Sequence, residues 1–438
     1  MRIIPYPSSV DFNQFNLSDP NPSAKYGLPK DIKFCKKCVM SNQLPSSAVE
    51  FLHTIESKKK TMPLNEKQVC DACRFNEAKA TSIDWTKRER ELKELCERFR
   101  SEDGSYDCIV PGSGGKDSFY AAHMLKYKYG MHPLTITWAP HIYTECGWHN
   151  FQAWVNAGFD NILHTPNPRV HRLLTRLAVD NLLHPFQPFI LGQKHLAYKL
   201  SIRYNIPLVF YGENSAEYNT KFSEGTSASY STEFCIGDDF NQLYFGGASV
   251  SELNGDFGLS YGDLAPYLPV NTASVGNQKV EIYYLGYYLP WHPQGCFYYA
   301  VEHGGFRPSP ERTVGTYSKY NSIDDKIDDF HYYTTYIKFG LGRASYDASQ
   351  EIRNNEINRE EGVALVRKYD GEWPERFADE IFRYLSIPSE EYPIASKMFE
   401  QPIMDKEYFT RLCDNFRSPH LWERTNGEWR LRHSVFAD

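Results

Sequence analysis

The most informative stretch of the chain is residues 112–118, which read Gly-Ser-Gly-Gly-Lys-Asp-Ser directly after the apolar run 106–110. This order predicts a strand, a tight turn and the start of a helix. Backbone N–H groups can converge on a phosphate in such a turn, and the positive end of the helix dipole strengthens the attraction. Lys116 can neutralise phosphate charge, Asp117 can hold Mg²⁺, and the serine hydroxyls can donate to phosphate oxygens.

The spacing excludes two other phosphate-binding loops. A Walker loop needs glycine five positions before Gly115, where Val110 stands, and Ser or Thr after its lysine, where Asp117 stands. A dinucleotide fingerprint would also need glycine in place of Asp117. The string at 113–118 resembles the PP-loop of the ATP pyrophosphatases, enzymes that split ATP into AMP and pyrophosphate. The alternative is a glycine-rich surface turn without a ligand.

Two Cys-x-x-Cys pairs, Cys35/Cys38 and Cys70/Cys73, can close a tetrahedral Zn²⁺ site. Their separation, residues 39–69, is longer than the roughly 15–20 residues usual in such sites. The alternatives are a redox dithiol or two unrelated pairs. A closed Cys₄ site has no open position, so we expect a role in folding or docking.

Composition limits the remaining classes. The 438 residues suffice for two or three domains, and a net charge of −7 gives no overall attraction to nucleic acid. No apolar run is long enough for a membrane span, and the polar, proline-bearing start is not typical of a signal peptide. Ten cysteines without a secretion signal favour thiols or metal ligands, so we expect a cytoplasmic protein.

Short apolar segments alternate with amphipathic ones, which predicts an α/β fold with a doubly wound, mainly parallel sheet. The expected strands are 106–110, 134–138, 161–164, 207–211 and 280–288. The expected helices are 84–100, 120–125, 149–157, 168–183, 189–204 and, in a mainly helical region from about 290, 325–353, 359–369, 374–386 and 404–416.

This pattern divides the chain into an extended lead-in (1–30), a Cys₄ zinc module (31–83), a PP-loop domain (84–290) and a helical region for substrate or partner (291–438). Residues 219–278, rich in Ser, Gly and Asn, interrupt the PP-loop domain and are predicted to form an insertion or lid.

Ligands in doubly wound sheets bind outside the carboxyl ends of the strands. Gly212, Glu213 and Asn214 follow strand 207–211, so we expect them to face the glycine loop, with Glu213 or Glu217 binding Mg²⁺ or orienting a nucleophile. The alternative is that Asn214 or its neighbour caps a helix. The predicted ATP-binding residues are Ser113, Gly114, Gly115, Lys116, Asp117, Ser118, Thr137 and Gly212, and the predicted catalytic residues are Lys116, Asp117, Glu213 and Asn214.

Residues 306–345 are dense in polar groups of the kinds that bind phosphates, carboxylates and sugars. The candidates for substrate binding are Arg307, Arg312, Tyr317, Lys319, Tyr320, Lys338 and Arg343. A solvated charged helix would explain part of this pattern, but the interleaved aromatic residues favour a lined cleft.

Together these strings resemble the N-acetyl sugar amidotransferase family, which includes the WbpG-type lipopolysaccharide enzymes and the PseA-type enzymes. Beside the cysteine pairs and the PP-loop, the resemblance rests on residues 211–214, 315–320 and 338–343, and it runs from Cys35 to about residue 370. Val314 departs from the family pattern, where glutamate is expected.

The resemblance implies that ATP, with Mg²⁺, adenylylates the acetamido oxygen of a UDP-N-acetyl sugar and that ammonia then displaces AMP, leaving an acetamidino group. The chain neither begins with cysteine nor has glycine after Cys296, so ammonia is expected from a separate HisH/HisF-like glutaminase and cyclase-like pair. The product would enter bacterial O-antigen, capsule or flagellin glycan synthesis.

Two rival interpretations remain. A tRNA-thiolating PP-loop enzyme can also carry an N-terminal zinc module, but such enzymes pair the loop with further reactive cysteines and bind RNA electrostatically. No Cys-x-x-Cys pair follows residue 118 here. A non-catalytic scaffold is disfavoured by the intact Lys116, Asp117 and Ser118.

Overall fold

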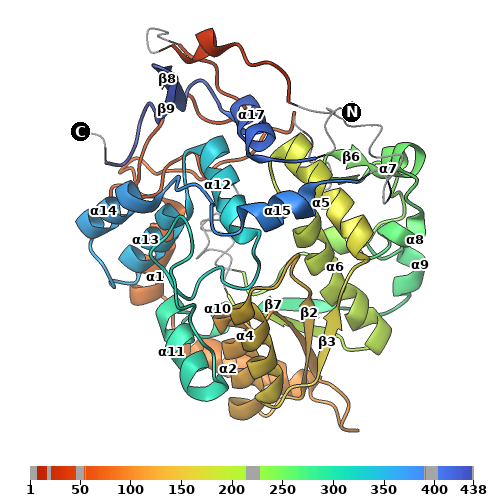
Figure 1. Cartoon of the computed structure of the whole chain (residues 1–438). Helices are drawn as coiled ribbons and strands as arrows, with labels where there is room; N and C mark the ends of the chain where they lie inside the picture. Colours follow the sequence, from red (N-terminus) through yellow and green to blue (C-terminus); the bar gives the residue numbers. More distant parts are fainter. Residues whose placement is uncertain are drawn as a thin grey trace.

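The computed structural model describes residues 7–16, 21–45, 54, 56–213, 227–388, 390 and 403–436. Within them, a five-stranded sheet has the order β3-β2-β1-β4-β7, and all its neighbouring strands are parallel (Figure 1). Its strands are β1 (Cys108–Pro111), β2 (Pro133–Trp138), β3 (Asn161–His164), β4 (Leu208–Tyr211) and β7 (Glu281–Tyr284). The predicted α/β class with a parallel sheet is therefore confirmed.

Helices cover both faces of this sheet. Ile109 and Val209 of the central strands pack in one hydrophobic cluster with α5 (Pro168–Leu182) and α6 (Gln187–Tyr204). The alternate residues Cys108, Val110 and Phe210 pack in a second cluster on the opposite face. The helices of this second face are α2 (Trp85–Phe99), α3 (Lys116–His123), α4 (Glu145–Asn156), α10 (Leu285–Tyr288) and α11 (Pro293–Gly304). Central strands with both faces buried account for the near-continuous apolar runs in the sequence.

The strand order reverses beside β1, and this reversal positions the candidate site. The chain passes from β1 outward through β2 to β3, and then returns to the other side of β1 as β4. In open α/β sheets, such a reversal leaves a crevice at the carboxyl ends of the two strands concerned. The turn at 112–115 leaves β1 there, and residues 212–213 leave β4 there.

Two glycines allow the elements around the crevice to approach closely. Gly114 has φ +87°, and a Cβ atom on it would lie 2.6 Å from the carbonyl oxygen of Asn150 in α4. A Cβ atom on Gly212 would lie 2.5 Å from the carbonyl oxygen of Asp117 in α3. Glycine is therefore needed at both positions to bring α4 and the end of β4 against the loop. Helix α3 continues beyond His123 into a π-helical turn, η2 (Met124–Lys128).

The described part of the predicted insertion lies between β4 and β7 and forms part of the core. It contains η5 (Glu233–Cys235), β5 (Tyr244–Phe245), β6 (Ala248–Ser249), α7 (Val250–Phe257), α8 (Tyr261–Leu264) and α9 (Thr272–Val275). Phe245, Leu253 and Tyr267 are buried in the same cluster as α5 and α6. These residues thus add a layer to one face of the sheet.

The predicted strand 280–288 is wrong beyond Tyr284, because residues Leu285–Tyr288 form helix α10. Arg88 of α2 donates to the carbonyl oxygen of Tyr287 at 2.8 Å, and its guanidinium lies 3.9 Å from the centre of that tyrosine ring. Packing on α2 therefore overrides the strand propensity of this aromatic run.

The region beyond residue 290 is mainly helical, as predicted. It contains α12 (Asp328–Phe339), α13 (Arg343–Arg353), α14 (Arg359–Tyr369), α15 (Ala378–Leu385) and α17 (Lys406–Phe416). The single helix expected over 325–353 is broken at Gly340, which has φ +68°. A hairpin of β8 (Trp422–Thr425) and β9 (Glu428–Leu431) was not predicted, although its Asn-Gly turn is a strong hairpin signal.

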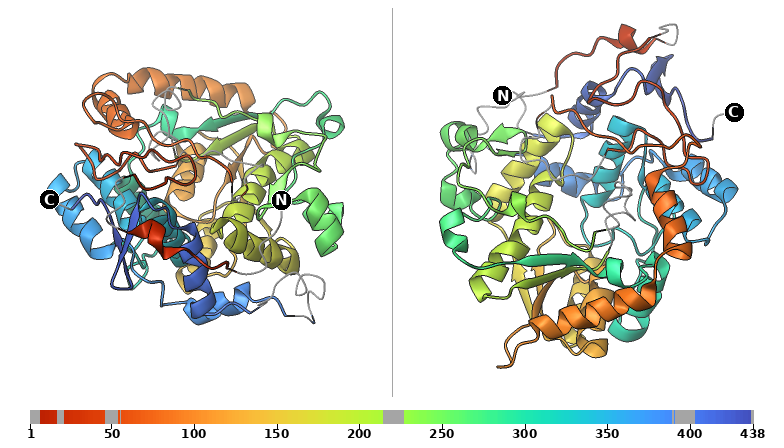
Figure 2. Two further views of the ribbon diagram at one scale, coloured as in Figure 1. Left: turned by 90° about the horizontal axis from the view of Figure 1, so that it is seen from above. Right: turned by 180° about the vertical axis from the view of Figure 1, so that it is seen from behind.

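The N-terminal segment packs on the C-terminal end of the chain, as Figures 1 and 2 show. Phe15, in the short helix η1 (Phe12–Phe15), is buried with Leu421 and Trp422. The Tyr26 hydroxyl donates to the carbonyl oxygen of Phe416 at 2.9 Å. Helix α1 (Asp71–Thr81) begins directly after Cys70 and contains Cys73 in its first turn. None of the helices in the described ranges has the length and apolar character needed to cross a bilayer.

Candidate functional site

Two adjoining cavities lie where β1 and β4 end. The larger has a volume of about 530 Å³ and the smaller about 260 Å³. Both are lined by Ser113, Gly115 and Asp117 of the glycine loop and by Tyr332 and Arg343 of α12 and α13. The loop predicted to bind phosphate and the C-terminal helices therefore face one common space.

The charged residues of the glycine loop are held in place by direct contacts. Lys116 is buried, with 7% of its surface exposed, and its Nζ donates to Asp117 Oδ2 at 2.6 Å. Trp291 Nε1 donates to the other oxygen of this carboxylate at 2.9 Å. No side chain in the described ranges caps α3, so the first N–H groups of this helix are available to an anion.

Glu213 places a second carboxylate near Asp117. It lines the larger cavity, and burial, together with the nearby Asp117 charge, raises the pKa of Glu213. A divalent cation between two such carboxylates would relieve their repulsion, so this pair fits the predicted Mg²⁺. Asn214 and Glu217, predicted beside it, lie outside the described residues.

Two predicted ATP-binding residues, Gly212 and Thr137, have structural roles in this protein. Gly212 allows the end of β4 to touch α3, as described above. Thr137 is buried in β2, and its hydroxyl accepts a hydrogen bond from Asn161 Nδ2 at 3.1 Å. Thr137 lines neither of the two cavities.

Of the seven residues predicted to bind substrate, Tyr320 and Arg343 line the cavities. The Tyr320 ring is stacked on Phe297 of α11, with 4.4 Å between ring centres. The other five contact protein groups elsewhere: the Arg307 N–H donates to Asn150, Arg312 pairs with Glu372, Tyr317 donates to Glu351, Lys319 donates to the Pro310 carbonyl, and Lys338 donates to the Leu182 carbonyl. None of these five residues lines either cavity.

Several side chains that line the cavities belong to no motif and were not predicted from the sequence. They are Gln193 and Lys194 of α6, Asn150 of α4, His331 and Thr335 of α12, and Tyr346 of α13. His331, Tyr332 and Thr335 of α12 line the larger cavity, whereas Lys338, nearly one turn beyond Thr335 on the same side of the helix, donates to the Leu182 carbonyl at the end of α5. Burial lowers the pKa of His331 to about 3, so this imidazole is neutral near pH 7.

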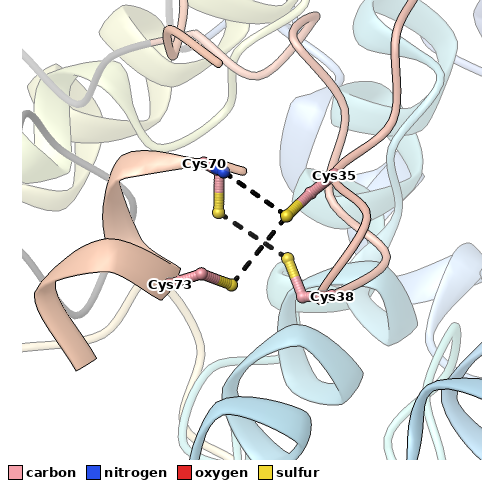
Figure 3. A group of neighbouring side chains, drawn as sticks. All are labelled: Cys35, Cys38, Cys70 and Cys73. Atoms are coloured by element: carbon pink, nitrogen blue, oxygen red, sulfur yellow. Dashed lines mark hydrogen bonds between the residues drawn. The ribbon is translucent and has the colours of Figure 1, made fainter. Parts of the chain in front are cut away.

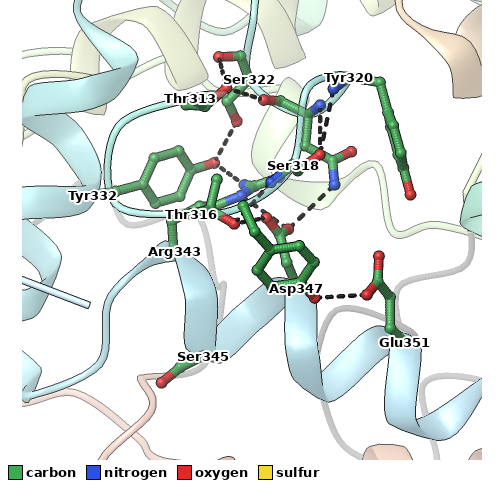
Figure 4. A network of polar contacts seen from close by, with 12 residues as sticks. Thr313, Thr316, Ser318, Tyr320, Ser322, Tyr332, Arg343, Ser345, Asp347 and Glu351 are labelled. Atoms are coloured by element: carbon green, nitrogen blue, oxygen red, sulfur yellow. Dashed lines mark hydrogen bonds and ion pairs between the residues drawn. The ribbon is translucent and has the colours of Figure 1, made fainter. Parts of the chain in front are cut away.

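Arg343 is the fixed cation at the junction of the cavities (Figure 4). Its Nε lies 3.0 Å from Asp347 Oδ1, and its guanidinium donates to the Tyr332 hydroxyl. Thr316 and Asn321 donate to the same Asp347 carboxylate at 2.6 and 3.2 Å. The buried charge is therefore compensated and its position fixed by several hydrogen bonds.

The four predicted cysteine ligands come together in a buried cluster (Figure 3). Their sulfur atoms lie within 4.8 Å of one another, with Cys35 and Cys73 at 3.9 Å and Cys38 and Cys70 at 3.7 Å. A tetrahedral metal with sulfur bonds of about 2.3 Å would give edges of about 3.8 Å. The N–H groups of Lys37 and Cys70 also donate to Cys35 Sγ. The cluster can therefore hold a structural zinc ion.

This cluster packs directly on the C-terminal helices. Leu341 is buried with the cysteines, and Tyr346 and Ile352 of α13 pack beside it. Arg359 Nε donates to the carbonyl oxygen of Cys38 at 3.3 Å. Tyr346 also lines the larger cavity, so α13 lies between the cysteine cluster and the candidate site.

The C-terminal part of the chain is similar to a known protein family. Residues 314–435 match the family model described as the C-terminal domain of WbpG-like lipopolysaccharide biosynthesis proteins. Tyr332, Arg343 and Asp347 all lie within this match. Over 53 residues, 12% of its length, the chain is also 38% identical to the uncharacterized protein MJ1599 of Methanocaldococcus jannaschii, and this match covers 19% of that protein.

Proposed function

Because residues 314–435 match the C-terminal domain of WbpG-like lipopolysaccharide biosynthesis proteins, we propose that the chain is an ATP-dependent amidotransferase. It would convert an acetamido group of a nucleotide-linked sugar to acetamidino, with release of AMP and pyrophosphate. The match by itself associates the chain with polysaccharide biosynthesis, and the specific reaction is the proposal.

One observation carries this proposal. The glycine loop and two residues of the WbpG-like region, Tyr332 and Arg343, line the same cavity of about 530 Å³. A loop suited to phosphates and a region matched to saccharide biosynthesis would then act on ligands held together. Neither cavity is lined by a cysteine, whereas the thiolating enzymes considered above use reactive cysteines.

In the first step, the oxygen of the acetamido group attacks the α-phosphorus of ATP. A new C–O–P linkage forms, the bond to the β-phosphate breaks, and pyrophosphate leaves. Ser113, Gly115, Lys116 and Ser118 would bind the phosphates, and the N–H groups at the start of α3 would stabilise the developing charge. Asp117 and Glu213 would hold Mg²⁺, which supplies further charge stabilisation on the phosphates when bound.

In the second step, ammonia attacks the activated carbon and AMP leaves with the former amide oxygen. An unreactive amide becomes an electrophile because AMP is a good leaving group. Protons must be taken from the amide nitrogen and from ammonia. Glu213 and, on sequence grounds, Asn214 are proposed to orient the attacking ammonia.

Ammonia would come from a separate HisH/HisF-like glutaminase pair in the cytoplasm. The product would serve bacterial surface polysaccharide synthesis.

Exchange of labelled pyrophosphate into ATP, measured with diacetamido UDP-sugars present, tests the first step. We expect wild-type protein to exchange label and Asp117→Ala to lose it, because Mg²⁺ binding and the position of Lys116 both depend on this carboxylate. Asp256→Asn, an exposed change in α7, is the matched control and should exchange at the wild-type rate. Exchange that survives in Asp117→Ala would rule out the proposed role of this loop.

A further inference from the structure

The larger cavity contains a cation that the proposed mechanism does not use. Lys194 of α6 lines this cavity together with the glycine loop. Its ammonium group lies 5.6 Å from the centre of the Tyr230 ring. Since α6 packs on the sheet face opposite to α3, Lys194 approaches the cavity from the other side of the crevice.

The other two cations around the cavities are neutralised by carboxylates. Lys116 is paired with Asp117 at 2.6 Å, and Arg343 with Asp347 at 3.0 Å. Within the part of the chain that the structure describes, which leaves out residues 214–226, Lys194 has no carboxylate at ion-pair distance.

Burial lowers the pKa of Lys194 to about 8, and Glu213 only partly opposes this effect. An ammonium group that is partly buried, and that no carboxylate of the described residues neutralises, is costly to keep charged, and perturbed groups of this kind cluster at ligand sites.

We propose that Lys194 binds a phosphate group of the nucleotide held in the larger cavity, across the crevice from the glycine loop. This inference rests on the proposed function, because it takes the ligand to be a nucleotide. A phosphate-bearing ligand has two sources in that reaction: the triphosphate of ATP and the diphosphate of the nucleotide sugar. Lysine suits either source, since it binds phosphate as a point charge with freely rotating donors.

Affinity for ATP, pyrophosphate and UDP, each titrated separately by calorimetry with Mg²⁺ at pH 7, tests this assignment. Lys194→Met should weaken at least one of these ligands about 10- to 100-fold, the effect of losing a charge-assisted hydrogen bond. A loss for ATP and pyrophosphate assigns Lys194 to the triphosphate, and a loss for UDP alone assigns it to the sugar nucleotide. Lys194→Arg should restore most of the affinity.

Lys199→Met is the matched control on the same helix. Lys199 is also partly buried, but its ammonium donates to the carbonyl oxygens of Ala265 and Pro266, and Lys199 does not line the cavity. Its replacement should leave all three affinities unchanged, and thermal unfolding checks that each variant is folded.

A titration against pH gives a second readout that does not depend on Lys194→Met folding. The groups that face Lys194 are Glu213 after β4, Cys235 in η5, the Tyr230 ring, and His195 on its own helix. Wild-type affinity should fall as pH rises above about 8, where the free ammonium loses its proton, and Lys194→Arg should not show this fall.

This inference is overturned if Lys194→Met binds all three ligands with wild-type affinity and Lys194→Arg shows the same pH profile as the wild type. The proposed function would then still stand. Failure of the wild-type protein to bind any of the three would overturn both.

Discussion

Replacing Gly212 by alanine tests whether the close approach of β4 and α3 creates the site. The added Cβ would lie 2.5 Å from the carbonyl oxygen and 3.0 Å from the carbonyl carbon of Asp117, where ordinary contacts begin at 3.4 Å. Both neighbours are backbone atoms at the start of a helix, so no flexible side chain can move aside. The end of β4 or the start of α3 must therefore shift by close to 1 Å, because the distance of 2.5 Å to the carbonyl oxygen falls 0.9 Å short of the 3.4 Å contact limit.

Overpacking of this kind costs about 1–3 kcal/mol of unfolding free energy. A displacement of about 1 Å at reacting groups lowers catalytic rates by roughly 100-fold. We therefore expect Gly212→Ala to lose both stability, measured by denaturant unfolding, and pyrophosphate exchange. Gly255→Ala is the control, because Gly255 lies in α7 and a Cβ there meets no atom within 4 Å. That change should leave exchange intact and add up to about 1 kcal/mol of helix stability. Gly212→Ala with wild-type stability and exchange would refute this account of the crevice.

Three further predictions concern the groups around the site. Cys73→Ser should lower the zinc content, measured by elemental analysis, and should lower the free energy of unfolding by several kcal/mol, because α13 packs on the cluster. Cys146→Ser is the control and should change neither quantity. Full stability in a zinc-free variant would contradict a structural metal. Arg343→Met should lower the free energy of unfolding by about 3–5 kcal/mol, because it leaves the Asp347 carboxylate buried without its cation. The double variant with Asp347→Asn should recover part of this stability. Additive effects of the two changes would argue against the ion pair. Burial raises the pKa of Asp370 to about 6, from 3.8, so its protonated form is favoured in the folded state. Its contribution to stability is therefore fully present below about pH 4 and is lost as pH rises through 6, by roughly 3 kcal/mol. The difference in unfolding free energy between wild type and Asp370→Asn across this pH range measures this contribution.

The sequence could predict the elements whose pattern is local. The alternation of apolar and amphipathic segments located β1 to β4 and the helices between them within a few residues. The glycine loop was found because its spacing excludes other phosphate loops. The prediction that a strand reaches residue 288 was wrong, because Arg88, about 200 positions earlier in the chain, contacts Tyr287 and favours a helix there. The β8–β9 hairpin could have been predicted from Asn426-Gly427, since both residues have positive φ angles.

The walls of the site were harder to predict than its floor. The residues chosen between 306 and 345 have the right chemistry, but the sequence does not say which of them face inward. His331, Tyr332 and Thr335 of α12 line the larger cavity, while Lys338, further along the same side of the helix, donates to the Leu182 carbonyl. That choice depends on how α12 packs against the rest of the protein. Lys194 was not predicted because α6 carries no motif. The order of the strands brings this helix beside the cavity, and that order is not visible in the local sequence.

The central claim is that ATP activates an acetamido group for replacement of its oxygen by nitrogen. Mass spectrometry of diacetamido UDP-sugars incubated with the protein, ATP, Mg²⁺ and ammonium tests this claim most directly. The account predicts that one sugar changes mass by the exchange of one oxygen atom for an NH group, with AMP formed in equal amount. Unchanged sugars, or ADP in place of AMP, in a protein that binds ATP would contradict it.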